Sequence, residues 1–375
     1  DTYKNSKVSQ ILSSALILIL IFSSIGTIIL IVLAFIMQRK VLFYILPAAV
    51  FVGLSSVMKG FFLGTKETAP VGWSLLAESL IRTLFGMYCV QSMILYYIEK
   101  ETRGAVFALG VGEFISLFVL YLFFKTKRIN LNISIASIKD IKDILNIAIP
   151  VSLSQIIGSF SSSIKAFLLP KSLEISGYTA SGAMALYGKT SGMVLPLLFF
   201  PSHFIASLSS NIIPRISGAL ARSNANYAFE LAEQSLVFSS LFSFAVTGLF
   251  ICLSTPISEL IYRGQALEEL IIGFAPGIPF FYIESILFSI LRSTGNNLTP
   301  IKISVLDFFM TNILVYVLVT KPIFGVYGYS LALITASAIS ILICLQSLEK
   351  QFRKKFNIAN IFLKPLLSMV FMSYI

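Results

Sequence analysis

Charged side chains stand inside several of the most apolar stretches of this sequence. Glu78 and Arg82 are four residues apart in the stretch GWSLLAESLIRT, so a helix would place both on one face. Glu113, Glu284 and Asp307 lie in other apolar stretches and have no lysine or arginine four residues away. Because an ionised side chain at the middle of a bilayer costs about 3 kcal/mol, each of these groups needs a partner, a proton or a charged substrate.

These carboxylates allow two kinds of role, and the sequence leaves both open. Glu78 and Arg82 either form a self-neutralised pair that holds helices together, or line a cavity in which Glu78 binds a proton or a cation. Asp307 needs a partner from another segment. Glu113 and Glu284 either stay protonated and hydrogen-bond to a serine, or take part in ion coupling. We therefore expect four cavity or coupling carboxylates: Glu78, Asp307, Glu284 and Glu113.

Basic side chains in the same environment are candidates for binding an anionic substrate. Lys165 lies in the serine-rich stretch GSFSSSIKAFLLP, and Lys189 lies in LYGKTSGMVLP. Either ammonium group would meet a phosphate as a point charge, with nearby hydroxyls as further donors, or would only brace the bundle. Arg82 and Arg292 are further cavity candidates, although Arg292, like Lys59, lies toward a helix end from which a long side chain extends to water.

The sequence predicts no catalytic site, metal site or cofactor. His203 is the single histidine, and the three cysteines, Cys89, Cys252 and Cys344, lie in apolar runs without the spacing of a metal site. A membrane-embedded prenyl-phosphate transferase would need clustered acidic residues for Mg²⁺, and no Asp-rich motif is present. We expect His203 to be a hydrogen-bonded core residue, with proton coupling as the alternative.

The elements that hold these residues are predicted to be membrane-spanning helices. Of 375 residues, 57% are hydrophobic and only 12% are charged, against about 25% charged in a typical soluble domain. About 20 apolar residues cross the hydrocarbon core as a helix, and runs of that length are too long for barrel strands. Ten complete apolar segments lie near 11–37, 42–63, 71–97, 104–124, 144–169, 184–213, 229–254, 270–291, 301–320 and 324–346. We expect an all-α polytopic bundle, with an eleventh helix that begins near 360 and is cut off.

The net charge of +11 is interpreted loop by loop, because the chain is expected to lie in a membrane. Placing the N-terminus inside puts the larger share of loop Lys and Arg on the cytoplasmic side, as the positive-inside rule requires. This predicts a multi-pass protein of the cell membrane, with the N-terminus of this chain and the 126–142 loop in the cytoplasm and no nucleic-acid partner. The basic stretch EKQFRKKF is expected to contact anionic lipid headgroups.

An internal repeat predicts the domain organisation. The stretches PAAVFVGLSSVMKGFFLGTKETAP and PFFYIESILFSILRSTGNNLTP each contain an apolar helix, a polar turn with glycine, and a proline that opens a second helix. Pro70 and Pro300 anchor the match, and the offset of about six helices leaves the two copies in parallel orientation. We expect a partial N-lobe (1–125), an inter-lobe loop (126–142), a C-lobe (143–346), and a basic linker with the start of a further helix (347–375).

Three stretches carry a resemblance to a known family: MKGFFLGTKETAP, ALYGKTSGMVLPLLFFPSHFIASLSSNIIPRISGAL, and LRSTGNNLTP followed by GVYGYSLALITASA. They resemble the stage V sporulation protein B and polysaccharide-flippase branch of the multidrug/oligosaccharidyl-lipid/polysaccharide (MOP) exporter superfamily, which includes lipid II flippases and MATE transporters. The resemblance covers nearly all of the chain. It implies two pseudo-symmetric six-helix lobes that work by alternating access, with the first two helices of the family missing here.

The resemblance also implies a substrate and partners. The substrate would be a lipid-linked oligosaccharide of the undecaprenyl-pyrophosphate type, a precursor of peptidoglycan, the cell wall or a surface polysaccharide. Membrane lipids and a coupling ion, Na⁺ or H⁺, are the other implied partners. Lipid II flippases place an arginine in the helix that corresponds to the one around Lys189, and Lys189 is the nearest cation here.

Three functional classes follow, in the order in which the sequence favours them. A flippase for lipid-linked oligosaccharides fits the resemblance and the scattered cations that could line a cavity. A MATE-type cation-coupled drug antiporter is the alternative, and it is favoured if carboxylates outnumber cations in the cavity. A membrane-embedded enzyme is disfavoured, because the acidic motif it would need is absent.

Overall fold

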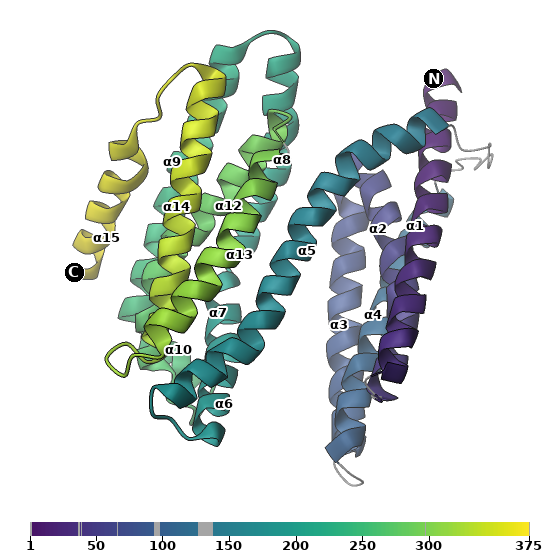
Figure 1. Ribbon diagram of the computed structural model, residues 1–375. Coiled ribbons are helices and arrows are strands. Elements are labelled where there is room, and N and C mark those ends of the chain that lie inside the picture. The colour runs from purple at the N-terminus through teal and green to yellow at the C-terminus, as the bar shows by residue number, and fades with distance from the viewer. Residues whose placement is uncertain are drawn as a thin grey trace. The chain divides into compact units, whose positions relative to one another are not determined.

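The computed structural model describes residues 2–36, 38, 40–65, 67–93, 98–126, 138–296 and 298–374 (Figure 1). Within these ranges the chain forms helices and no strand, which confirms the predicted all-α fold. Its contacts divide it into two compact units, residues 1–146 and 147–375. The units are described separately below, and the lobe boundaries expected from the sequence stay a prediction.

The first unit is a bundle of long helices with a small aromatic core. Its helices are α1 (Thr2–Ile36), α2 (Leu46–Gly64), α3 (Thr68–Met93) and α4 (Ile98–Thr126), and a 3-10 helix, η1 (Lys40–Ile45), precedes α2. Helix α4 packs against both α2 and α3, and α1 packs against α2. The ring of Phe61 meets those of Phe62 and Phe124 edge-on, with centroids 5.3 and 5.4 Å apart. Large apolar side chains such as Ile28 and Phe35 point outward, as expected of a surface that faces lipid.

A tight turn joins α2 to α3 and sets the two helices beside each other. The backbone N–H of Thr65 donates to the carbonyl of Phe61 at 3.0 Å, and that of Glu67 donates to Phe62 at 2.8 Å. Pro70 then stands in the first turn of α3, where its missing N–H costs no hydrogen bond. The hairpin predicted from the repeat is therefore formed, and it brings the polar residues of both helices within reach.

The second unit is larger and is built around α12. Its helices are α5 (Ile138–Ile175), α6 (Ala180–Lys189), α7 (Leu195–Phe199), α8 (Ser202–Ala221), α9 (Ala225–Cys252), α10 (Ser254–Ile261), α11 (Glu268–Phe274), α12 (Ile278–Ser293), α13 (Leu298–Val319), α14 (Tyr327–Phe352) and α15 (Lys364–Tyr374), with π turns η2 (Thr190–Val194) and η4 (Ala359–Leu363) and a 3-10 turn η3 (Ala275–Gly277). Helix α12 contacts α8, α9 and α14, and its side chains Ile283, Ile286, Leu287 and Ile290 are fully buried. Helix α5 begins in the first unit and continues into the second.

The predicted segment 184–213 is a broken helix. The α6–α7 part (180–199) and α8 meet at an angle of 47°, with Pro201 at the break. A proline has no backbone N–H and clashes with the preceding turn, which accounts for the bend. The buried hydroxyl of Tyr282, on α12, donates to the carbonyl of Leu198 at 2.7 Å and so satisfies a polar group beside the break.

Helix length and composition identify the chain as a multi-pass membrane protein. Seven helices of the described residues are long and apolar enough to span a bilayer, and the bent α6–α8 pair makes eight if it counts as one span. Helices α3 and α5 have 26 and 38 residues, which is enough to span, but they carry more polar side chains. The 126–142 loop is shorter than predicted, because α4 includes Thr126 and α5 begins at Ile138; residues 127–137 lie outside the described part of the chain.

Candidate functional site

Helices α2, α3 and α4 bring four charged side chains together in the first unit. The Nζ of Lys59 lies 3.0 Å from Oε2 of Glu78 and 4.0 Å from Oε2 of Glu113. On the other side of Glu78, Nη1 of Arg82 lies 3.3 Å from Oε1. We call Lys59, Glu78, Arg82 and Glu113 the first-unit ion network. With two cations and two carboxylates it is neutral when every group is ionised.

The network contains the interactions expected from the sequence and one that was not expected. The Glu78–Arg82 pair is present, and Ser55 donates to Oε2 of Glu113 at 2.7 Å. Lys59 was expected to extend to water, but its side chain is only 18% exposed and lies against two carboxylates. The attraction between an ammonium and two little-exposed carboxylates is strong where water is scarce, which accounts for the difference.

A glycine of α4 makes room for this network. A Cβ atom on Gly112 would lie 3.0 Å from Cβ of Arg82 and 3.2 Å from the carbonyl oxygen of Glu78. Both distances are tighter than ordinary van der Waals contact. The missing side chain therefore lets α3 and α4 approach closely at the turn of α3 that carries the ion pair.

A second group of charged residues lies in the second unit, on α5, α12 and α13. Lys165 and Glu284 each interact electrostatically with Asp307, and no direct ion pair within 4 Å joins these three described residues. Thr311 donates to Oδ1 of Asp307 at 2.8 Å, and Ser337, on α14, donates to Oε2 of Glu284 at 2.7 Å. We call Lys165, Glu284 and Asp307 the second-unit polar cluster. It holds two carboxyl groups and one cation.

Two side-chain contacts about one turn away join α5 to α13. The side-chain amide of Asn312 donates to Oγ of Ser161 at 3.2 Å, and the rings of Phe160 and Phe308 stack with centroids 5.8 Å apart. Ser161 is four residues before Lys165, so both lie on the same face of α5. Lys165 is therefore the cation on another segment whose charge acts on Asp307, although these two described residues make no direct ion pair.

The two units repeat one polar bridge with its ends exchanged. In the first unit a serine of α2, Ser55, donates to a glutamate of α4, Glu113. In the second unit the glutamate, Glu284, is on α12 and the serine, Ser337, is on α14. The internal repeat pairs α2 with α12. Both glutamates thus make the serine hydrogen bond that the sequence suggested, and their role in ion coupling stays a prediction.

Two of the basic residues that the sequence suggested for substrate binding lie away from the second-unit polar cluster. Lys189 donates to the backbone carbonyl of Gln265 at 2.6 Å, in the connection between α10 and α11. Arg292 is exposed in the last turn of α12. In the described part of the chain neither makes a hydrogen bond or ion pair with that cluster. The bond of Lys189 favours the bracing alternative, and substrate contact by Lys189 or Arg292 stays a prediction.

His203 differs from its expected place. Its Nδ1 lies 2.9 Å from the carbonyl oxygen of Phe200, so it is hydrogen-bonded as expected, but the residue is exposed and is not part of the core. It lies in the first turn of α8, directly after the break at Pro201. Among the described residues no group of three or more His, Cys, Asp or Glu side chains could hold a metal ion.

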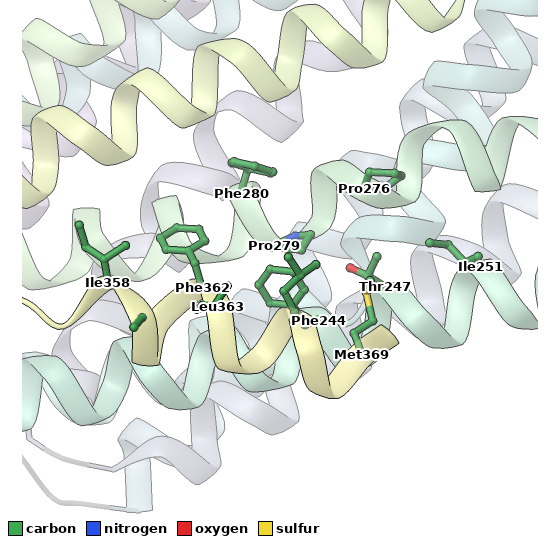
Figure 2. Close-up of a pocket in the computed structure, with 12 residues that line it drawn as sticks. Phe244, Thr247, Ile251, Pro276, Pro279, Phe280, Ile358, Phe362, Leu363 and Met369 are labelled. Carbon is green, nitrogen blue, oxygen red and sulfur yellow. The ribbon is translucent and has the colours of Figure 1, made fainter. Parts of the chain in front are cut away.

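An apolar pocket of about 640 Å³ lies between α9, α12 and the η4–α15 segment, and no pattern in the sequence predicted it (Figure 2). Phe244, Pro279, Phe280, Phe362 and Met369 are among its lining residues. It draws on parts of the chain more than a hundred residues apart, so no local pattern marks it. Its lining carries no charge, and it therefore offers nothing that would recognise a phosphate.

Comparison with known proteins identifies a relative of this chain. Stage V sporulation protein B of Bacillus subtilis (strain 168) is 25% identical over 316 residues, covering 82% of this chain and 60% of that protein. The chain thus spans less than two thirds of the length of this relative.

Solved structures show the same fold at low sequence identity. A lipid II flippase MurJ in an inward closed conformation has a TM-score of 0.61 at 20% identity, covering 100% of this chain and 77% of the other. An outward-facing multidrug resistance MATE family transporter of the MOP superfamily has a TM-score of 0.73 at 16% identity, covering 92% of this chain and 78% of the other. The family described as lipid II flippase MurJ matches residues 5–375. With a match over nearly its whole length, the chain belongs to the lipid II flippase MurJ family of the MOP superfamily.

Proposed function

We propose that the protein carries a lipid-linked saccharide precursor, of the pyrophosphate-linked type used for peptidoglycan or another surface polysaccharide, across the cell membrane. One observation supports this most directly: α5, a spanning-length helix of this lipid II flippase family member, holds a lysine, Lys165, whose charge interacts with that of Asp307 on α13. A cation held inside a membrane bundle is suited to an anionic headgroup, because its attraction is strong where water is scarce.

In this proposal Lys165 exchanges one anion for another. Without substrate its ammonium is balanced by Asp307, with which it makes no direct ion pair among the described residues. A phosphate oxygen can then approach the ammonium without a salt bridge having to break first. Thr311 continues to donate to Asp307 and keeps that carboxylate in place. The four carboxyl groups Glu78, Asp307, Glu284 and Glu113 are the proposed places for a coupling proton or Na⁺.

The wider proposal keeps the features expected from the sequence. Arg82 is the accessible cation of the first-unit ion network, with 42% of its side chain exposed, and it is a further candidate for headgroup contact together with Lys189 and Arg292. Transport would use alternating access, in which the two units move as bodies. The N-terminus of the chain and the 126–142 loop would lie in the cytoplasm.

Transport by the full-length protein in proteoliposomes tests the role of Lys165. We expect Lys165→Ala to slow movement of a fluorescent lipid-linked saccharide by at least about tenfold, or 1.4 kcal/mol, because a charge contact in a low-dielectric site is lost. Lys165→Arg should keep much of the rate, since charge is the feature that matters. Lys171→Ala is the matched control: Lys171 lies on the same helix and forms only an exposed pair with Glu174. Equal rates for Lys165→Ala and the control, at equal thermal stability, would contradict the proposal.

A cation-coupled exporter is the second candidate, and one observation favours it. The second-unit polar cluster has two carboxyl groups and one cation, so its balance suits a cationic substrate or ion. If this candidate is correct, Asp307→Asn and Glu284→Gln will abolish efflux of a cationic dye, while Lys165→Ala transports the lipid-linked saccharide no worse than the control.

A further inference from the structure

Four basic side chains line a cavity at the C-terminal end of α14. The cavity has a volume of about 340 Å³, and its lining consists of Gln346, Glu349, Lys350, Arg353, Lys354 and Lys355. All four basic residues are exposed. Glu349 is the one acidic residue of the lining, so the cavity is strongly positive. We call it the basic pocket.

The backbone around the basic pocket is held in place by defined contacts. Arg353 ends α14 in the left-handed conformation, with φ of 55°, and turns the chain. The N–H of Phe356 then donates to Oε1 of Glu349 at 3.1 Å. The N–H of Asn357 donates to Oε1 of Glu233, on α9, at 3.2 Å. These bonds join the turn to α14 and α9, so the backbone that carries the basic side chains is held in place.

Buried aromatic side chains also hold the turn in place. Phe352 and Phe356 are buried, and their rings lie 5.7 and 4.8 Å from that of Phe229, between centroids. Lys354 places its Nζ 5.3 Å from the centroid of the same Phe229 ring, a cation–π contact. The remaining basic residues, Lys350, Arg353 and Lys355, have no described acidic partner within ion-pair distance, and Glu349 is engaged by the backbone.

The position of the basic pocket indicates its ligand. The spanning segment Tyr327–Phe352 ends at the pocket, so the pocket lies where the hydrocarbon core meets water. Phospholipid phosphates lie at that depth, and each lysine or arginine near an anionic surface contributes about 1 kcal/mol of attraction. We propose that the basic pocket is a binding site for the phosphate headgroup of an anionic membrane phospholipid, distinct from the polar clusters proposed to act in transport.

The test titrates the full-length protein in detergent with short-chain phosphatidylglycerol and follows bound lipid by native mass spectrometry. We expect the combined change Lys350→Gln, Lys354→Gln and Lys355→Gln to weaken binding by at least about tenfold, and more at low than at high salt. The matched control removes the same charge from three exposed residues of the same unit outside the pocket, as Lys171→Gln, Arg263→Gln and Lys321→Gln. The control should change binding by less than about twofold, and replacing the three pocket lysines by arginine should preserve it.

Three results would overturn the proposal. In the first, the control variant would weaken binding as much as the pocket variant, and net charge alone would then attract the lipid. In the second, phosphatidylcholine of the same chain length would bind as tightly, and the negative headgroup would then not matter. In the third, inorganic phosphate would displace the lipid at equal concentration, and the pocket would then be a site for a free anion. If the triple variant has a lowered melting temperature, Lys355→Glu alone decides, and it must weaken binding by at least about threefold.

Discussion

At the scale of single residues, Lys59 links the two carboxylates of the first-unit ion network. It is the only described cation within 4 Å of Glu113, and it is one of two that contact Glu78. Removing the partner of a charged group that is this little exposed lowers the stability of the protein, because an unpaired charge is then left where water solvates it poorly. Lys59 therefore allows Glu78 and Glu113 to stay ionised inside the helix bundle.

Substitution of Lys59 tests this dependence. We expect Lys59→Met to lower the stability of the purified protein by about 3 kcal/mol, because Glu113 loses its cation and Glu78 keeps only Arg82. Adding Glu113→Gln should recover much of the loss, since the amide still accepts the hydrogen bond of Ser55 and leaves Glu78 and Arg82 as a balanced pair. Thermal unfolding in detergent measures both. Additive losses in the double variant would show that Lys59 and Glu113 are not coupled.

Sequence spacing predicted only the short-range part of these clusters. Glu78 and Arg82 are one helical turn apart, so their pairing follows from helix geometry alone. Lys59 and Glu78 are 19 residues apart, and Glu284 and Ser337 are 53 apart, so these contacts depend on how helices pack. A pattern within one helix cannot show which face meets a neighbour's polar residue. The residues could be named from the sequence, but not most of their partners.

At the scale of elements, the apolar runs predicted the helices but not the bend inside the run 184–213. The run 184–213 contains Pro196 and Pro201, and the structure bends at Pro201, while Pro196 lies inside the continuous 180–199 stretch, directly after the π turn η2. A local π turn can accommodate a residue that has no N–H, so the helix does not break there. The break persists because Tyr282, from α12, supplies the donor for Leu198.

Removal of the Tyr282 hydroxyl tests this support. We expect Tyr282→Phe to lower stability by about 1–3 kcal/mol, because the carbonyl of Leu198 would be left buried without its donor. Hydrogen exchange of the amides in 195–203 should speed up with it. Tyr316→Phe is the matched control, since Tyr316 is 53% exposed. Equal melting temperatures for the two variants would show that another group satisfies Leu198.

At the scale of the whole molecule, the two units differ in charge although they share a repeat. The first-unit ion network balances two cations with two carboxylates, whereas the second-unit polar cluster has one cation for two carboxyl groups. The serine–glutamate hydrogen bond also differs between the units. Both units have it, but the glutamate is on α4 in the first unit and on α12 in the second. We therefore expect the second-unit polar cluster, more than the balanced first-unit ion network, to gain or lose a proton or cation during transport.

The orientation of the molecule in the membrane rests on the loop charges, and it leads to the last prediction. We expect a cysteine placed at Ser134, in a variant of the full-length protein without native cysteines, to react with an impermeant maleimide only after cells are permeabilised. The reason is the excess of Lys and Arg that a cytoplasmic 126–142 loop would share. Lys321→Cys should react in intact cells, because the connection before α14 is separated from that loop by an odd number of spans in the expected topology. Labelling of Ser134→Cys in intact cells would reverse the predicted orientation.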